Sequence, residues 1–145
     1  MRRFLVLLLV ISGILSGCSN DEISFSEVNI DKVKEDVKDF IRGIEASESE
    51  KGTGIYMFNE SDKVRYLYLD KDFLDNEKGF GDLDIKVDDN SLNIYLTDSL
   101  DAAVSEEEYK LYKIKLKSNE EYEYMKVFKN GEETNLQLIG LKDID

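Results

Sequence analysis

The spacing of apolar residues changes once along the chain, and this change separates a helical part from a part built of strands. Between residues 29 and 46 the apolar positions fall four, three, one and three residues apart, which places them on one face of an α-helix. After Gly54 apolar and polar residues alternate instead, as in half-buried β-strands. We therefore predict a helix over 29–46, followed mainly by strands. The apolar face of this helix contains Val33, Val37, Phe40, Ile41 and Ile44.

Turn-forming residues divide the alternating part into pairs of strands. Polar or glycine-containing segments separate neighbouring apolar runs, as expected for hairpins in an antiparallel sheet. The pair Asn130-Gly131 is typical of a tight turn in which both residues take positive φ angles. We predict three hairpins and a closing strand. Their strands cover residues 55–58 with 64–69, 83–87 with 92–96, 112–116 with 122–128, and finally 134–139.

One helix followed by about seven strands predicts an α+β fold. The apolar face of the helix needs a partner, and a curved antiparallel sheet or a small barrel would supply one. We therefore expect an N-terminal amphipathic helix packed on such a sheet, in a single domain over residues 29–145, because chains of this length rarely contain two independent cores. Residues 18–28 are polar and without a period, and we expect them to act as a tether.

The start of the chain has the composition of an export signal. Arg2 and Arg3 precede an apolar run over residues 4–11, and small residues follow it. In such a signal the basic start holds the N-terminus in the cytoplasm, and the apolar run enters the membrane ahead of a cleavage point. The run is shorter than the roughly 20 apolar residues that a permanent transmembrane helix needs. We therefore assign residues 1–17 to a signal peptide.

The leader ends in Leu15-Ser16-Gly17-Cys18, and this tetrapeptide resembles the lipobox of bacterial lipoproteins. Cys18 is the only cysteine in the chain, and its thiol can carry a diacylglyceryl group as a stable thioether. The resemblance implies lipidation of Cys18 and an extracytoplasmic protein anchored to the cell membrane by two or three acyl chains such as palmitate. The lack of proline and the frequent lysine, asparagine and glutamate are typical of a Gram-positive bacterium.

The composition limits both the ligands that the protein can bind and the catalytic or metal sites that it can form. The chain has 32 acidic and 19 basic residues, a formal charge of −13 and no histidine. Removal of Arg2 and Arg3 with the leader brings the charge to −15. Such a charge argues against nucleic-acid binding, which needs lysine and arginine to neutralise phosphates, and it favours a cationic protein or peptide as partner. The lack of histidine excludes Ser-His-Asp and Cys-His nucleophiles and the usual zinc sites.

Acidic residues are dense in the connection between the first two hairpins. Asp70, Asp72, Asp75 and Glu77 lie in one loop, and oxygen-rich loops can bind calcium. The spacing departs from that of an EF-hand loop, because Leu74 stands where a ligand is needed. We favour a solvated acidic loop and keep these four residues as weak calcium candidates.

Tyrosine pairs two residues apart occur on two of the predicted strands. Tyr66 and Tyr68 share one strand face, and Tyr122 and Tyr124 share another. Such pairs can form a flat face that stacks on sugars or grips a protein partner. Tyrosine is also favoured on ordinary half-buried strands, which is the simpler interpretation. If the domain has a binding face, we expect it to be a tyrosine face bordered by acidic residues, with these four tyrosines as candidates.

These patterns predict a lipid-anchored extracytoplasmic binding or interaction module, with a cationic protein or peptide as one concrete ligand. We expect no catalysis and no cofactor beyond the covalent lipid on Cys18. One alternative is a barrel that binds a small ligand in a central cavity. Another is a carboxylate-dependent cell-wall enzyme, for which Asp84 and Glu123 stand out because apolar or aromatic residues flank them in the sequence.

Overall fold

The computed structural model describes residues 23–47, 51–75, 78–100, 107–116 and 122–141. This part of the chain contains nine strands, one α-helix and two short 3-10 helices. In chain order the elements are β1 (Ser24–Glu27), η1 (Ile30–Lys32), α2 (Glu35–Ala46), β2 (Ile55–Asn59), β3 (Val64–Leu69), η2 (Lys71–Phe73), β4 (Gly79–Asp88), β5 (Ser91–Ser99), β6 (Lys110–Lys115), β7 (Tyr124–Lys129), β8 (Glu132–Thr134) and β9 (Leu138–Leu141).

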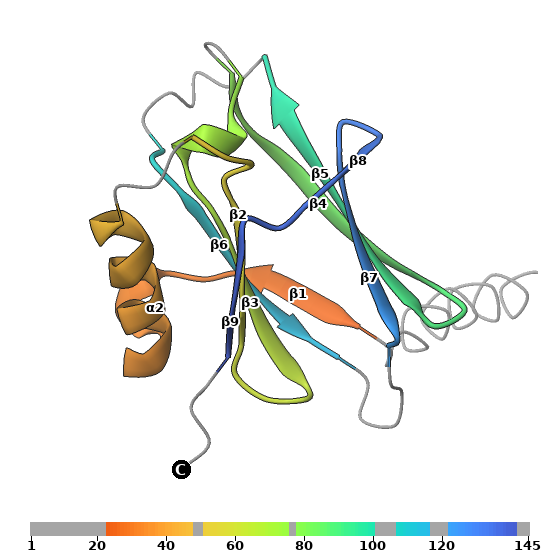
Figure 1. Cartoon of the computed structure of the whole chain (residues 1–145), viewed down its shortest axis with the longest axis horizontal. Helices are drawn as coiled ribbons and strands as arrows, with labels where there is room; N and C mark the ends of the chain where they lie inside the picture. Colours follow the sequence, from red (N-terminus) through yellow and green to blue (C-terminus); the bar gives the residue numbers. More distant parts are fainter. Residues whose placement is uncertain (1–22, 48–50, 76–77, 101–106, 117–121, 142–145) are drawn as a thin grey trace, which may run out of the picture.

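The strands form two sheets, and Figure 1 shows α2 on the outer side of one of them. The five-stranded sheet has the order β1-β6-β3-β2-β9, and the four-stranded sheet has the order β4-β5-β7-β8. Neighbouring strands are antiparallel except for β2 with β9 and β5 with β7. The predicted combination of a helix with mostly antiparallel strands is confirmed. The prediction of about seven strands in a single sheet or barrel is wrong, because the described residues form nine strands in two sheets.

The central strands of the five-stranded sheet, β2, β3 and β6, are largely buried on both faces, and this produces a three-layer arrangement. In β2, Ile55 and Met57 belong to the core between the two sheets, whereas Tyr56 and Phe58 belong to the core under α2. Side chains alternate across a strand, so one strand contributes to both cores. The four-stranded sheet is buried on one face only, as the alternation of half-buried and exposed residues along β4 shows. The space between the sheets is filled by apolar side chains, with Ile94 and Ile114 fully buried.

The predicted helix forms, but it is shorter than expected and does not begin the fold. Residues 30–32 adopt the 3-10 helix η1, where the side chain of Asn29 accepts a hydrogen bond of 2.9 Å from the N–H of Asp31. α2 then buries Val37, Ile41 and Ile44 against the sheet. Because β1 precedes the helix, the expectation of an N-terminal helix is wrong.

Strand β1 lies inside the segment that was expected to be a tether. Ser24–Glu27 pair antiparallel with β6, so these four residues belong to the folded domain. The N–H of Val28 also donates to the carbonyl of Leu111 at 2.9 Å. The tether prediction is therefore wrong for this part of residues 18–28, and residues 18–22 lie outside the described part.

The first two predicted hairpins are confirmed as β2–β3 and β4–β5. The turn at Asn130-Gly131 is confirmed as well, because both residues have positive φ and connect β7 to β8. The third predicted hairpin is wrong: β6 joins the five-stranded sheet, and β7 pairs with β5 in the other sheet. The predicted closing strand over 134–139 is divided between the end of β8 and the start of β9.

Candidate functional site

The tyrosine pair of β3 lies in the core beneath α2. Tyr66 is 3% exposed and Tyr68 is 4% exposed, and both pack in the same cluster as Ile41 of the helix. The helix covers this side of the sheet. The pair therefore does not offer the flat stacking surface that the sequence predicted.

The second tyrosine pair lies elsewhere. Tyr124 begins β7 and is 62% exposed, whereas Tyr122 packs partly against the core between the two sheets. Tyr66 and Tyr68 face the helix on the other side of the five-stranded sheet. The structure does not bring the four candidate tyrosines together.

The acidic loop of the calcium hypothesis divides between different contacts. The side chain of Asp70 caps η2 by accepting a 2.9 Å hydrogen bond from the N–H of Asp72. Asp75 is exposed and forms an ion pair of 3.4 Å with Lys129 of β7. Glu77 lies outside the described residues. Within the described residues, no group of three or more acidic or cysteine side chains is placed to hold a metal ion.

Two further predictions concern possible catalytic carboxylates and the site of lipidation. Asp84 and Glu123, the carboxylates considered for an enzyme, are both exposed rather than enclosed by apolar side chains. Cys18, the predicted site of lipidation, lies outside the described residues. Among the described residues, no helix has the length and hydrophobicity required to cross a bilayer.

An acidic groove runs beside the C-terminal end of α2 and the start of β6. It consists of two adjoining pockets of about 560 and about 270 Å³, which share Glu108 and Tyr109 as lining residues. The larger pocket is lined by Glu27, Val28, Asn29, Glu107, Glu108, Tyr109 and Leu111. The smaller pocket is lined by Glu45, Tyr68, Asp70, Lys71, Asp72, Glu108 and Tyr109. Six carboxylates therefore line the groove together with two tyrosine rings.

The topology gathers these residues from four separate parts of the chain. β1 ends beside the start of β6, which places Glu27 near Glu107. Tyr68 comes from the helix-facing side of β3, and Glu45 comes from the last turn of α2. η2 follows β3 directly and brings Asp70 to the smaller pocket.

Close backbone packing holds η2 in place. Gly54 has a φ of +71°, and its carbonyl accepts a 3.1 Å hydrogen bond from the N–H of Asp70. A Cβ atom at Gly54 would lie 2.2 Å from the backbone nitrogen of Phe73, so only glycine fits this position. Phe73 is fully buried and stacks on Phe80 with ring centroids 6.2 Å apart. Asp70 and Asp72 are thus presented by a rigid turn.

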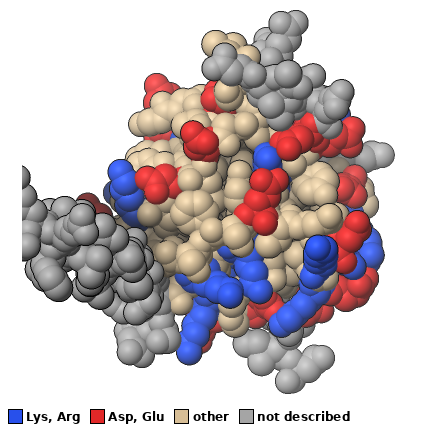
Figure 2. Space-filling model, turned by 180° about the vertical axis from the view of Figure 1, so that it is seen from behind, with Lys and Arg blue, Asp and Glu red and all other residues tan. Residues whose placement is uncertain are grey.

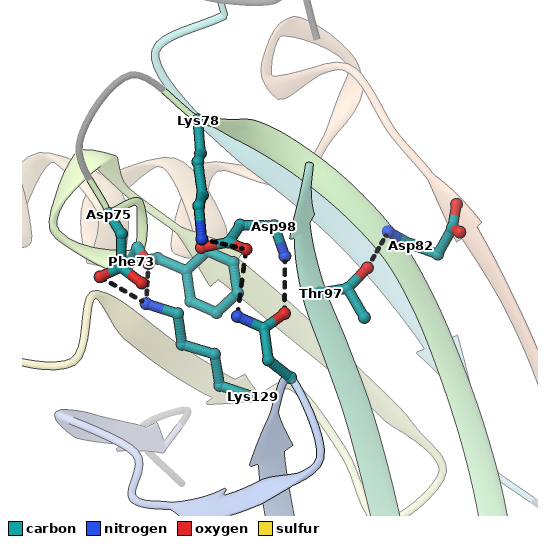
Figure 3. A network of polar contacts seen from close by, with 8 residues as sticks. Phe73, Asp75, Lys78, Asp82, Thr97, Asp98 and Lys129 are labelled. Atoms are coloured by element: carbon teal, nitrogen blue, oxygen red, sulfur yellow. Dashed lines mark hydrogen bonds and ion pairs between the residues drawn. The ribbon is translucent and has the colours of Figure 1, made fainter. Parts of the chain in front are cut away.

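Side chains of the four-stranded sheet contact the end of η2 and residues of the connection from η2 to β4, as Figure 3 shows. The ammonium of Lys129 donates to the carbonyl of Phe73 and lies 4.7 Å from the centre of its ring. Lys78 lies 3.5 Å from the carboxylate of Asp98, to which the side chain of Asn130 donates at 3.0 Å. Phe73 and Lys78, on either side of this connection, are therefore both held by side chains of the four-stranded sheet.

Three tyrosine rings link the interior of the fold to the groove. The ring centroids of Tyr56 and Tyr68 are 5.9 Å apart, and those of Tyr68 and Tyr109 are 5.8 Å apart. Burial raises the pKa of Tyr56 to about 12, with Asp70 as the next cause, and the Tyr56 hydroxyl donates a hydrogen bond to Asp70. Burial and then the charge of Glu45 raise the pKa of Tyr68. Burial also raises the pKa of Asp70.

Two lysines offset part of the negative charge. Lys110 lies 3.0 Å from Glu27 and 2.9 Å from Glu107, and its side chain is only 13% exposed. Lys71 lies 3.3 Å from Glu108, and both of these side chains are mostly exposed. The six carboxylates outnumber these two ammonium groups, so the groove keeps a negative field that attracts cations.

Surface charge elsewhere is mixed. On the face seen in Figure 2, basic side chains gather toward the lower edge while acidic side chains occupy the upper and right-hand parts. Of the four tyrosines that the sequence offered as a binding face, only Tyr68 lines the groove, and it is buried there beside Tyr109. Periodicity could not locate the groove, because its lining residues are far apart in the chain, at 27–29, 45, 68, 70–72, 107–109 and 111. Comparison with protein-family models, curated proteins and solved structures gave no match to this chain.

Proposed function

We propose that the protein is a lipid-anchored, extracytoplasmic binding module that captures a cationic protein or peptide at the bacterial cell surface. The leader and the lipobox at Leu15-Ser16-Gly17-Cys18 support the location. A lipidated Cys18 would hold the domain at the membrane, since two acyl chains suffice for stable anchoring. The binding function is carried by the acidic groove.

The groove suits a cation because of its lining. Six carboxylates and the rings of Tyr68 and Tyr109 surround two adjoining pockets. Carboxylates form charge-assisted hydrogen bonds with ammonium and guanidinium groups, and the half-buried ring of Tyr109 attracts the same groups through its π face. The partially enclosed Asp70 gains most from a cation, because burial disfavours its charged form.

The charge of the whole domain supports the same ligand class. At −15 after removal of the leader, the domain attracts basic proteins over distances longer than direct contact. This attraction accelerates encounter, while the groove supplies the specific contacts. Cationic lysozymes, bacteriocins and antimicrobial peptides are ligands of the required chemistry.

Membrane fractionation and mass spectrometry of the full-length protein test the anchor. We expect the wild-type protein to be in the membrane fraction with a mass that includes acyl chains, and Cys18→Ala to lose both the acyl mass and cleavage before residue 18. Ser19→Ala is the matched control, because it changes the next residue without removing the thiol. Unchanged fractionation and mass in Cys18→Ala would disprove the anchor.

Salt-dependent association tests the binding function. The full-length protein in neutral detergent is measured against a cationic lysozyme, poly-L-lysine and an acidic albumin. We expect binding to the two cationic probes alone, and a steep loss of binding as salt rises from about 0.01 to about 1 M, since the Debye length falls from about 30 to about 3 Å. Absence of binding to both cationic probes, or binding that salt does not change, would disprove this function.

A further inference from the structure

The acidic groove lies at one end of the five-stranded sheet, and lysines gather at the other end. β1, β3 and α2 end beside the groove, and β6 begins there. The opposite termini of these four elements therefore share the far end of the sheet, where the β2–β3 turn also lies. On the face seen in Figure 2, acidic and basic side chains are separated in the same way. The charge of the domain is thus polarised along the sheet.

Lys63, Lys113 and Lys115 form what we call the basic end. Lys113 and Lys115 lie on the same face of β6, and Lys115 is in register with Val64, the residue after Lys63. The N–H of Leu116 also donates to the carbonyl of Lys63 at 2.7 Å, so the three lysines are neighbours. No acidic side chain of the described residues forms an ion pair with any of the three. Their charges are therefore available to a ligand.

Two acidic residues lie in the β2–β3 turn beside the basic end. Glu60 forms an ion pair with Lys34, and its side chain is only 7% exposed, so its charge is already compensated. Asp62 is exposed. Lys113 lies over the ring of Tyr66, with Nζ 5.9 Å from the ring centre. Among the described residues, the β2–β3 turn and the end of β6 together therefore carry more positive than negative charge, although the whole domain is strongly acidic.

The chain enters the domain at the basic end. β1 begins at Ser24, and the register partner of Ser24 on β6 is Lys115. Cys18, the predicted lipidation site, precedes Ser24 by six residues, which span at most about 20 Å when fully extended. A lipid on Cys18 keeps the basic end within about that distance of the bilayer. β1 then leads away from the anchor to Glu27, which lines the groove.

We propose that the basic end faces an anionic lipid surface and thereby turns the acidic groove away from the membrane. This inference rests on the proposed lipid anchor and specifies how the anchored domain is oriented. Lysines within about 8 Å of anionic head groups, the Debye length at physiological ionic strength, are attracted to them, whereas acidic surface is repelled. The anchor therefore holds the domain at the membrane, and the polarised charge orients it. The groove then faces the side from which a cationic partner arrives.

Fluorescence quenching in reconstituted vesicles measures the orientation. The acylated protein, produced from the full chain, is placed in vesicles of phosphatidylcholine with or without phosphatidylglycerol, and a nitroxide on a lipid head group serves as quencher. The acylated Cys18 cannot react with a thiol label. A fluorophore is therefore attached to Ser61→Cys in the β2–β3 turn, or to Ala46→Cys at the end of α2 beside the groove.

We expect the label at residue 61 to be quenched at least about twofold more than the label at residue 46 in vesicles with phosphatidylglycerol. The difference should shrink in phosphatidylcholine alone. It should also shrink in about 1 M salt, where the Debye length falls to about 3 Å. These comparisons leave every lysine in place, so they do not depend on how lysine variants fold.

Paired substitutions assign the effect to the basic end. Lys113→Gln combined with Lys115→Gln should reduce quenching at residue 61 to the level seen in phosphatidylcholine. Lys86→Gln combined with Lys126→Gln is the matched control, because it removes the same charge from the four-stranded sheet, and Lys86 also lies over an aromatic ring. It should leave the quenching unchanged. Lys113→Arg combined with Lys115→Arg keeps both charges and should behave like the wild type.

The outcomes separate this inference from the proposed function. If the acylated protein floats with the vesicles but the label at residue 61 is quenched equally with and without phosphatidylglycerol, the orientation inference is wrong while the anchor stands. The same holds if the control pair lowers quenching as much as the basic-end pair, because overall charge would then explain the effect. If the protein carries no acyl chain and does not float with phosphatidylcholine vesicles, the proposed anchor itself is wrong.

Discussion

Tyr68 and Tyr109 have ring centroids 5.8 Å apart, with a tilt of 33° between the ring planes. Tyr68 is fixed in the core beneath α2, whereas Tyr109 lines both pockets of the acidic groove. The contact connects the packed interior to the proposed binding surface. A site that is built on strands and core packing keeps its geometry better than one built on loops alone. Changes in the core beneath α2 are therefore expected to affect the groove.

Gly140 lies where β9 passes under Phe40 of the helix. A Cβ atom at Gly140 would lie 2.5 Å from the Phe40 ring and 3.1 Å from Phe58. We expect Gly140→Ala to lower the free energy of unfolding by about 1–3 kcal/mol, because overpacking displaces a ring. Urea unfolding measures the loss. Adding Phe40→Leu to Gly140→Ala should restore part of it.

Gly43 provides the matched control for this prediction. It lies inside α2, and an added Cβ would meet no atom within 4 Å in the described structure. Gly43→Ala should therefore raise the free energy of unfolding by about 0.5–1 kcal/mol through helix propensity. A stable Gly140→Ala variant, or equal effects at the two glycines, would contradict the packing of β9 beneath the helix.

The pair Asp98 and Lys78 should matter more to stability than a similar pair on the surface. The side chain of Asp98 is only 4% exposed, and it also accepts a hydrogen bond from Asn130. Asp98→Ala leaves these partners unpaired and should cost about 1–3 kcal/mol. Asp84 pairs with Lys86 at 3.8 Å, but both side chains are mostly exposed. Asp84→Ala should change stability by no more than about 0.5 kcal/mol. Equal losses in urea unfolding would refute the distinction.

Local patterns predicted the elements of this fold better than their arrangement. The turns after β4 and β7 are encoded by short polar segments such as Asn130-Gly131, so the β4–β5 hairpin and the β7–β8 turn could be identified from sequence. β6 and β7 are also consecutive and alternate in polarity, yet they belong to different sheets. Periodicity shows that a strand is half-buried, but it does not show in which sheet the strand pairs.

The same limit applies to the buried tyrosines and to the groove. Tyr66 and Tyr68 alternate with leucines, and this pattern suits either an exposed tyrosine face or a sheet covered on both sides. The helix that covers them ends at Ala46, far from both tyrosines in the chain. The parallel pairing of β9 with β2 joins still more distant residues, and no local signal specifies it. The acidic composition predicted a negatively charged surface, whereas the long-range strand topology determines which residues line the groove.

Alkaline pH should unfold the protein through its buried tyrosines. Burial raises the pKa of Tyr68 in the folded state above the value of about 10 in an unfolded chain. Its stabilising contribution is therefore complete below about pH 10 and is lost as pH rises through the folded-state pKa. Tyr68→Phe cannot ionise, so its alkaline unfolding midpoint, followed by circular dichroism, should lie at higher pH than that of the wild type. Tyr124→Phe, which changes an exposed ring, should not move the midpoint. The opposite order of the two variants would refute the prediction.

Asp70 should lower stability at neutral pH because its carboxylate is partly buried. Burial raises the pKa of Asp70 in the folded state, so its contribution to stability is greatest below the unfolded value of about 3.9 and declines as pH rises through the folded pKa. Asp70→Asn keeps an oxygen that can accept from the N–H of Asp72 and from Tyr56, but it carries no charge. We therefore expect Asp70→Asn to have a higher Tm than the wild type at pH 7.

The pH dependence of this difference distinguishes buried charge from a general effect of lost acidity. Below about pH 4 the wild-type carboxyl is protonated, so the Tm values of Asp70→Asn and the wild type should converge. Asp84→Asn is the matched control, since Asp84 also accepts a backbone hydrogen bond, from Ile85, but is exposed. It should show little change in Tm at either pH. A higher Tm in Asp70→Asn combined with weaker poly-L-lysine binding would mean that the Asp70 carboxylate lowers stability but contributes to cation binding. A lower Tm at pH 7 would contradict the burial of its charge.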